Sequence, residues 1–163
     1  MSPEELPFVQ GATLDHVAIA VHDAAETAKL FRDVLGAEFA MFGDNHDQGF
    51  RFVQYRFPGG GKVELVTPIG EGFVSRFLEK RGEGVHHMTF AVTDLRSQVE
   101  RMRAGGVELI MVDVENPHWR EAFIHPRSAH GVLIQVAESL HSEEDSAQHF
   151  QERFPAAVEL GLA

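Results

Sequence analysis

Four polar residues that can bind a metal recur at a fixed spacing in this chain. His16 in LDHVAIAV and His87 in HHMTFAV lie 71 residues apart, and Glu64 in KVELV and Gln135 in LIQVA are separated by the same 71 residues. The segments around the two histidines match position for position, which indicates a duplicated unit. The two coincident offsets place four candidate ligands on one internal repeat.

These residue types make a mixed nitrogen and oxygen ligand set. Two neutral imidazoles, one carboxylate and one amide oxygen suit Zn, Ni, Co, Mn or Fe, and they leave coordination positions for water or substrate. A single buried histidine is more often structural than a ligand, but a structural role does not explain why matched positions are polar within apolar strands. The pattern therefore predicts one divalent metal ion bound by His16, Glu64, His87 and Gln135.

Alternation of side-chain size predicts that each histidine lies in a β-strand. In the first copy Val17 and Ile19 share one face, while His16, Ala18 and Ala20 share the other. The second copy repeats this alternation from residue 87 onward. Because the neighbours of the histidine are small, its face is predicted to form the wall of a ligand cavity.

The order of elements is predicted to be the same in both copies. Each starts with the histidine strand, continues with a helix capped by aspartate, and ends with three strands. In the first copy the helix and strands are expected at 24–35, 38–42, 50–57 and 62–67. In the second they are expected at 95–104, 107–112, 121–125 and 131–137, and a short linking helix is expected at 73–78.

Length and composition restrict the class of protein. The 163 residues, 44% hydrophobic, can form one functional domain at 13–138, with modules at 13–68 and 85–138 and an acidic, partly helical extension at 139–163. A net charge of −11 argues against nucleic-acid or anionic-membrane partners. The absence of cysteine excludes disulfides and thiolate ligands. With neither an export signal nor a run near 18 apolar residues, the expected location is the cytoplasm.

Paired modules with ligands on their first and last strands resemble the vicinal oxygen chelate superfamily, which includes glyoxalase I, methylmalonyl-CoA epimerases and extradiol dioxygenases. Four segments are most similar to the epimerases: LDHVAIAVHD, VELVTPIGEG, VSRFLEKRGEGVHHM and FIHPRSAHGVLIQV. The resemblance covers residues 13–138 and implies an α+β fold, in which two tandem βαβββ modules form a curved, cupped mixed sheet. It also implies a homodimer. Whether the modules pair within one chain or across the dimer stays open.

The chain departs from the family at the carboxylates that move protons. The family has glutamate where Gln135 stands, and some epimerases have a second carboxylate near Phe52. Neither an amide nor a phenyl ring accepts a proton at neutral pH. Glu64 is therefore the predicted catalytic residue. Candidate contacts to the substrate are Phe52, Gln54, Trp119 and Arg127.

Together these observations predict a divalent-metal-dependent enzyme that forms a metal-stabilised enolate from a small acid, a ketone or a CoA thioester. It would act as an epimerase or as a glyoxalase-type lyase. One alternative is an Fe(II)-dependent dioxygenase, because His16, His87 and Glu64 can form a face of two histidines and one carboxylate. Another is a non-catalytic protein of the same superfamily that binds a small molecule.

Overall fold

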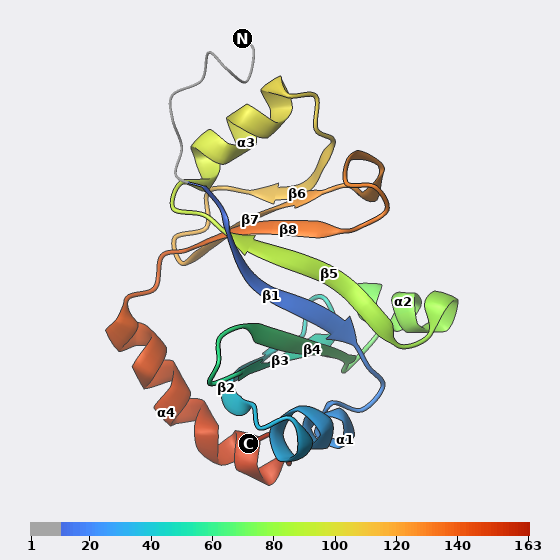
Figure 1. Ribbon diagram of the computed structural model, residues 1–163, viewed down its shortest axis with the longest axis vertical. Coiled ribbons are helices and arrows are strands. Elements are labelled where there is room, and N and C mark those ends of the chain that lie inside the picture. The colour runs from blue at the N-terminus through green and yellow to red at the C-terminus, as the bar shows by residue number, and fades with distance from the viewer. Residues whose placement is uncertain (1–10) are drawn as a thin grey trace. The chain divides into compact units, whose positions relative to one another are not determined.

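The computed structural model of the protein describes residues 11–163 and divides into two compact units. The first unit comprises His16–His86 and Glu143–Ala163, and the second comprises His87–Ser142 with residues 11–15. Helices and strands follow each other in the predicted order, strand, helix and three strands, once in each half of the chain (Figure 1). The predicted α+β class with two βαβββ modules is confirmed.

Four strands of the first module pair in the order β2-β3-β4-β1. Strand β1 runs parallel to β4, whereas β3 pairs antiparallel with both β2 and β4, so the sheet is mixed. The elements are β1 (Thr13–Ala20), α1 (Ala24–Ala28), η2 (Lys29–Val34), β2 (Glu38–Asn45), β3 (Phe50–Arg56), β4 (Lys62–Pro68) and α2 (Phe73–Arg81).

The second module repeats this topology in the order β5-β8-β7-β6. Here β5 is parallel to β8, and β7 is antiparallel to β8 and β6. The elements are β5 (Gly84–Ala91), α3 (Leu95–Ala104), β6 (Leu109–Asp113), β7 (Trp119–Ile124), η3 (Pro126–Ser128) and β8 (Ile134–Ser139). Strand β8 starts three residues later than predicted, because η3 and the turn that follows it occupy residues 126–132.

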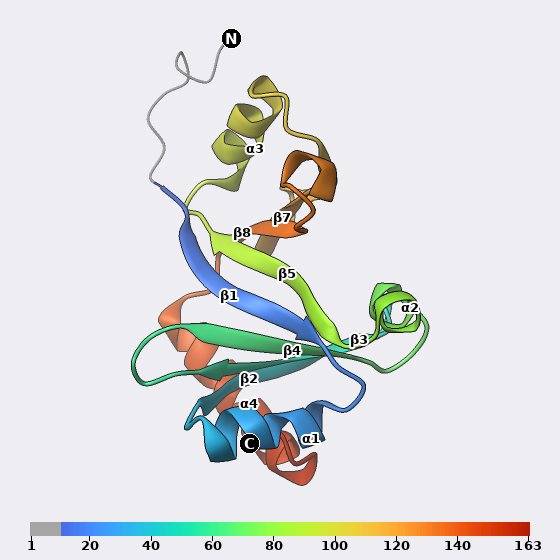
Figure 2. The same cartoon turned by 45° about the vertical axis from the view of Figure 1, so that its right-hand side comes forward.

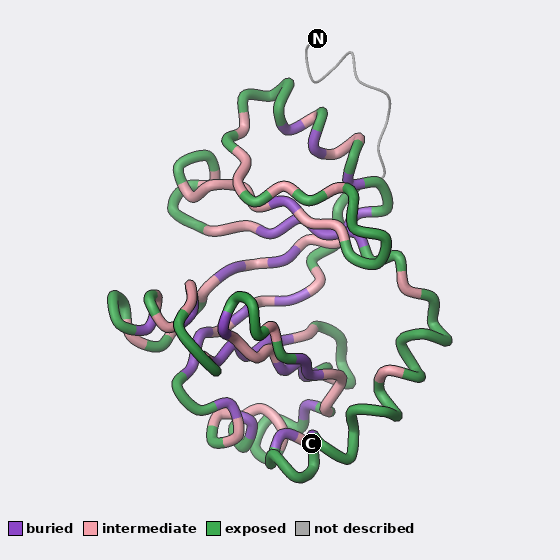
Figure 3. Tube along the Cα trace, turned by 180° about the vertical axis from the view of Figure 1, so that it is seen from behind, coloured by how far each residue is buried: buried purple, intermediate pink, exposed green. Residues whose placement is uncertain are grey.

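The C-terminal residues return to the core of the first unit. Helix α4 (Glu143–Glu159) lies beside β2 (Figure 2) and is exposed along most of its length (Figure 3). Ala157 and Leu162 are nevertheless buried in one cluster with Val53 and Tyr55. The Tyr55 hydroxyl donates to the Leu162 carbonyl oxygen at 2.6 Å. Arg32 donates to the carbonyl oxygens of the last turn, so the chain end is fixed by both apolar and polar contacts.

The helix expected at 24–35 changes its hydrogen bonding half-way along. It begins as an α-helix capped by Asp23 and continues from Lys29 as a π-helix, in which the Leu35 amide donates to the Leu30 carbonyl oxygen. The wider π-turn rotates the following side chains relative to an α-helix. In the π-helical part Leu30 and Val34 are exposed, as is Leu35 at its end, whereas Phe31 packs against the core.

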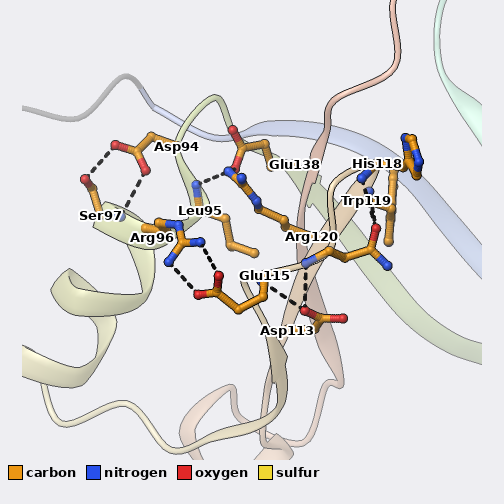
Figure 4. Close-up of polar contacts among 11 residues, drawn as sticks. Asp94, Leu95, Arg96, Ser97, Asp113, Glu115, His118, Trp119, Arg120 and Glu138 are labelled. Carbon is orange, nitrogen blue, oxygen red and sulfur yellow. Dashed lines mark hydrogen bonds and ion pairs between the residues drawn. The ribbon is translucent and has the colours of Figure 1, made fainter. Parts of the chain in front are cut away.

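Two hydrogen-bonded clusters hold the second unit together beside β7 (Figure 4). At the start of α3, Asp94 caps the Ser97 amide, and the Leu95 amide donates to Glu138 Oε2 on β8 at 3.1 Å. Arg120 donates to the same Glu138 oxygen at 3.3 Å. These contacts tie the helix N-terminus to strands β7 and β8.

The loop from β6 to β7 is shaped by side chains that accept backbone hydrogen bonds. Asp113 Oδ1 accepts from the amides of Glu115 and Asn116, and Asn116 Oδ1 accepts from the amides of His118 and Trp119 (Figure 4). Such Asx turns give the backbone a defined path. Strand β7 therefore begins at Trp119, two residues before the predicted start.

Candidate metal centre

In the first unit, strand pairing brings the predicted carboxylate beside the predicted histidine. The parallel register of β1 and β4 places Ala18 opposite Glu64, and His16 Nε2 lies 3.5 Å from Glu64 Oε2. From the other side, Gln54 Nε2 on β3 donates to the same Glu64 oxygen at 2.7 Å. Glu64 is thus held between an imidazole and an amide.

The second unit holds Gln135 in a similar way. On β5, the Thr89 hydroxyl donates to Gln135 Oε1 at 2.7 Å. From β7, Glu121 Oε2 accepts a hydrogen bond from Gln135 Nε2 at 2.6 Å. His87 lies on the same face of β5 as Thr89, and its ring centroid is 6.2 Å from that of Phe123.

All four predicted ligands are buried, with exposed fractions of 3% for His16, 8% for Glu64, 6% for His87 and 8% for Gln135. In the first unit a nitrogen and an oxygen donor lie side by side, with His16 Nε2 3.5 Å from Glu64 Oε2. Ligand atoms about 2.0–2.2 Å from one cation lie roughly 3–4 Å apart. The nitrogen and carboxylate donors therefore suit a divalent cation in both chemistry and spacing.

His86, next to the candidate ligand, belongs to an aromatic contact instead. Its ring packs against Phe73 at 5.3 Å and Phe77 at 4.9 Å, both on α2. Burial lowers the pKa of His86, while the charge of Glu64 acts in the opposite direction. The neutral imidazole is therefore favoured at this position.

The expected wall of small residues is only partly open. Ala20 and Val66 lie in a buried cluster with Val74 and Leu78 of α2, so a helix covers that end of the histidine face. Phe52 packs against the same cluster, and a Cβ built on Gly43 would lie 2.6 Å from its ring. The prediction that the whole face is a cavity wall was wrong at Ala20, because alternation along one strand does not show which helix packs on it.

The remaining predicted substrate contacts occupy different environments. Trp119 is partly exposed, and its indole Nε1 donates to Glu121 Oε2 at 2.9 Å. Arg127 is exposed in η3, where its guanidinium lies 3.2 Å from Glu108. Within residues 11–163, the side chain of Arg127 contacts His125 and Glu108, neither of which is a candidate ligand.

Glu121 is a site residue that the sequence analysis missed. It lies on the same strand face as Phe123, which pairs with Gln135 in the antiparallel register of β7 and β8. In the sequence WREAFI, Glu121 resembles an ordinary polar residue of an amphipathic strand. The sequence predicted a strand that starts at Glu121 but did not give its pairing register with the strand of Gln135. No local signal therefore linked the two side chains.

Comparisons with known proteins agree with this arrangement. The model of the glyoxalase/bleomycin resistance protein/dioxygenase superfamily matches residues 15–123. The chain belongs to this superfamily. The superfamily indicated by the sequence resemblance is thereby confirmed, and three of the four candidate ligands, His16, Glu64 and His87, lie inside the matched range.

Several similar proteins are methylmalonyl-CoA epimerases. An ethylmalonyl-CoA/methylmalonyl-CoA epimerase from Cereibacter sphaeroides is 33% identical over 128 residues, which cover 76% of this chain and 95% of the relative. Mitochondrial methylmalonyl-CoA epimerase from Homo sapiens is 28% identical over 130 residues, covering 77% of this chain and 73% of that protein.

Solved structures of epimerases share the fold. Methylmalonyl-CoA epimerase from Mycobacterium tuberculosis has a TM-score of 0.72 at 33% identity, covering 85% of this chain and 95% of its own. A methylmalonyl-CoA epimerase in complex with methylmalonyl-CoA and NH4+ has a TM-score of 0.70 at 30% identity, covering 79% and 95%. The protein is thus an epimerase-like member of the superfamily. Among residues 11–163, no helix is both long and apolar enough to span a membrane.

Proposed function

We propose that the protein is a divalent-metal-dependent isomerase that removes a proton next to the carbonyl group of a small acid or CoA thioester. One observation carries this proposal: the buried imidazole of His16 and the buried carboxylate of Glu64 lie 3.5 Å apart, which is the spacing of two ligands on one cation. Membership of a superfamily with epimerase relatives supports an isomerase. The chemistry of the candidate ligands and the similarity to epimerases thus favour the same class of reaction.

The residues proposed to hold one cation per chain are His16, Glu64, His87 and Gln135, with Zn, Ni, Co, Mn or Fe as the suitable metals. When bound, such a cation supplies an electrophile that polarises a substrate carbonyl and makes the neighbouring C–H bond more acidic. The imidazoles contribute nitrogen lone pairs, and Gln54 fixes one oxygen of Glu64 through its amide. The chain thereby presents the ligands in a fixed, water-poor setting.

Glu64 is proposed to hold the proton during the reaction. As the substrate C–H bond breaks, the electron pair stays on the substrate as an enolate, and the proton passes to the Glu64 carboxylate. Delivery of a proton from water to the opposite face inverts the carbon centre, and the proton on Glu64 then passes to water; return of the Glu64 proton to the same face regenerates the starting isomer. The candidate contacts Phe52, Gln54 and Trp119, with Arg127, would select the acyl group.

Methylmalonyl-CoA is the first substrate to test, because the named relatives act on it or bind it. We expect weak or absent epimerisation of this thioester. Position 135 carries an amide and position 52 a phenyl ring, so two groups that could exchange a proton with the substrate are missing. A small acid or thioester that requires only one carboxylate fits the residues better.

A second candidate is Fe(II)-dependent oxygen chemistry. It is favoured by the proposed ligands His16, His87 and Glu64, because two histidines and one carboxylate are the set typical of non-haem iron oxygenases. Anaerobic loading with Fe(II), followed by measurement of oxygen uptake with a catechol or a keto acid, separates the two functions. Rapid uptake would favour the oxygenase.

We further propose that residues 13–138 act as one domain, that 139–163 form an extension, and that the protein is a homodimer. These proposals rest on the two matched modules and on the resemblance to the epimerases. Light scattering coupled to gel filtration measures the mass of the assembly directly.

The metal site is tested by elemental analysis of purified wild-type protein and of His16→Ala and His87→Ala. The wild type should contain one divalent ion per chain, and both variants should lose it. His46→Ala is the matched control, because His46 is an exposed histidine of the first unit. If both ligand variants retain the ion at wild-type stoichiometry, the site lies elsewhere.

The reaction is tested by incubating metal-loaded protein with methylmalonyl-CoA in heavy water and measuring deuterium at the α-carbon. Exchange is expected to be far slower than the roughly 10 per second typical of enzymes. Exchange at that typical rate would show that a further proton-transfer group exists. Removal of the metal with EDTA should abolish whatever exchange is found.

A further inference from the structure

In each module a glutamine side chain donates a hydrogen bond to a carboxylate on the neighbouring strand, and the two modules place the carboxylate on different strands. In the first unit Gln54 donates to Glu64 at 2.7 Å, and the carboxylate is on the last strand. In the second unit Gln135 donates to Glu121 at 2.6 Å, and the carboxylate is on the neighbouring strand β7. Positions 64 and 135 are equivalent in the repeat. In the first module the candidate ligand Glu64 itself carries the negative charge, and in the second module Glu121 carries it next to the candidate ligand Gln135.

This hydrogen bond decides which way the Gln135 amide faces. The NH2 group points to Glu121, and the oxygen accepts from the Thr89 hydroxyl at 2.7 Å. In the reversed orientation the amide oxygen would face the carboxylate of Glu121 at about the same short distance. Both groups are then acceptors, which is repulsive. The amide is therefore held with its oxygen on the Thr89 side, the side from which β5 also presents His87.

Glu121 is itself fixed by its neighbours. Its Oε2 also accepts the indole N–H of Trp119 at 2.9 Å, and the backbone amide of Trp119 is fixed by Asn116. In the register of β7 and β8, Glu121 pairs with Ala137, two residues along from Gln135 on the same face. The carboxylate thus reaches Gln135 from a rigid strand whose start is defined by the preceding loop.

We propose that Glu121 is a positioning residue that makes Gln135 a competent ligand for a divalent cation; this inference rests on the proposed metal site. A carboxylate that accepts from an amide NH2 draws electron density toward the amide oxygen, as it does when it accepts from a ligating histidine. It also adds a second negative charge to that of Glu64, which balances a divalent cation. Glu121 acts through Gln135, and Trp119 and Thr89 hold the pair in place.

Binding of Co2+ to the metal-free protein tests this role, measured by equilibrium dialysis. Glu121→Ala should bind Co2+ about 10- to 100-fold more weakly than wild type, which is the usual effect of removing a group that orients a ligand. Glu121→Gln should lose less, because its amide oxygen can still accept from Gln135 and Trp119. Glu115→Ala is the control, since Glu115 is an exposed acid of the same unit that pairs with Arg96.

Fluorescence supplies a second reading of the same titration. Trp119 is the single tryptophan of the chain, and its indole contacts Glu121. Co2+ should therefore quench its emission in the wild type at the concentrations at which dialysis detects binding. In Glu121→Ala the quenching curve should shift to higher Co2+ by the same factor as the affinity.

A charge exchange tests the contact without metal. Gln135→Glu places two carboxylates against each other, so its Tm should fall. Adding Glu121→Gln restores an amide–carboxylate hydrogen bond with the arrangement of the first unit, so the double variant should regain most of the lost Tm. If the two changes are additive in Tm, the side chains are not coupled and the inference is overturned.

The outcomes separate the inference from the proposed function. A wild-type protein that binds no Co2+ overturns the metal site, and this role of Glu121 with it. Wild-type binding that is unchanged in Glu121→Ala overturns the role of Glu121 alone. Should the alanine variant fail to fold, Glu121→Gln and its additivity with Gln135→Glu still decide the question.

Discussion

Substitution of Tyr55 by phenylalanine tests how the chain end is attached to the core. The Tyr55 side chain is completely buried, and its hydroxyl donates at 2.6 Å to the carbonyl oxygen of Leu162, a residue that is 1% exposed. Burial raises the pKa of this hydroxyl to about 12, so it remains a protonated donor throughout the physiological range. Tyr55→Phe keeps the ring and removes only the donor.

The expected magnitude follows from the acceptor that is left behind. A buried carbonyl oxygen without its donor costs about 1–3 kcal/mol of unfolding free energy, and no cavity term adds to this because the ring stays. For a chain of this size each kcal/mol lowers Tm by about 2–4 °C. Leu162→Ala should cost more, about 2–5 kcal/mol, because it removes a buried side chain from the cluster of Val53 and Leu65.

Thermal and urea unfolding of the wild type and both single variants, with the double variant added, measure these differences. Since Tyr55 and Leu162 are in contact, their effects should be less than additive. Val158→Ala is a suitable control, because Val158 is exposed on the same C-terminal segment. A Tyr55→Phe protein as stable as the wild type would refute the reasoning, and would mean that the C-terminal residues are not docked in solution.

Two further predictions concern Glu64 and a cross-strand ion pair. Glu64→Gln should keep most of the metal, because an amide oxygen still coordinates, and should reduce turnover of any substrate found by roughly 10²-fold; wild-type turnover in this variant would make Glu64 a ligand only. Asp44 accepts two hydrogen bonds from Arg51 at 2.6 and 2.8 Å, and this contact lowers the pKa of the Asp44 carboxyl in the folded protein. The stabilisation is therefore present above the unfolded pKa of about 3.9 and is lost as the pH falls through the lower folded value. Asp44→Asn should unfold more easily than the wild type at pH 7, by about 1 kcal/mol, and the difference should disappear in acid titrations of Tm.

The repeat itself could be predicted from the sequence, because the information is local. Strand alternation around His16 and His87 depends on successive side chains pointing to opposite faces, which any strand obeys. The helix caps Asp23 and Asp94 also act within three residues, on the amides of Glu26 and Ser97. Element order and the candidate ligands therefore followed from short segments and their matched spacing.

The ends of the strands and the course of the first helix were harder to predict from the sequence. Strand β7 starts where Asn116 fixes the preceding loop, and the helix after Asp23 widens into a π-helix at Lys29. In both cases an apolar pattern fits several alternatives that differ by one or two residues. Hydrogen bonds of the preceding loop make this choice for β7, and the backbone hydrogen bond from Leu35 to Leu30 makes it for the helix; periodicity reports neither.

The sequence alone thus determined the duplicated modules and the residue types available to a metal, because these depend on composition and local alternation. The tertiary structure decided what each of those residues touches. The contact of Gln135 with Glu121 needs the register of two antiparallel strands, and the contact of Tyr55 with Leu162 joins positions 107 residues apart. Such pairings arise from packing and strand register across the whole unit, so no segment read by itself contains them.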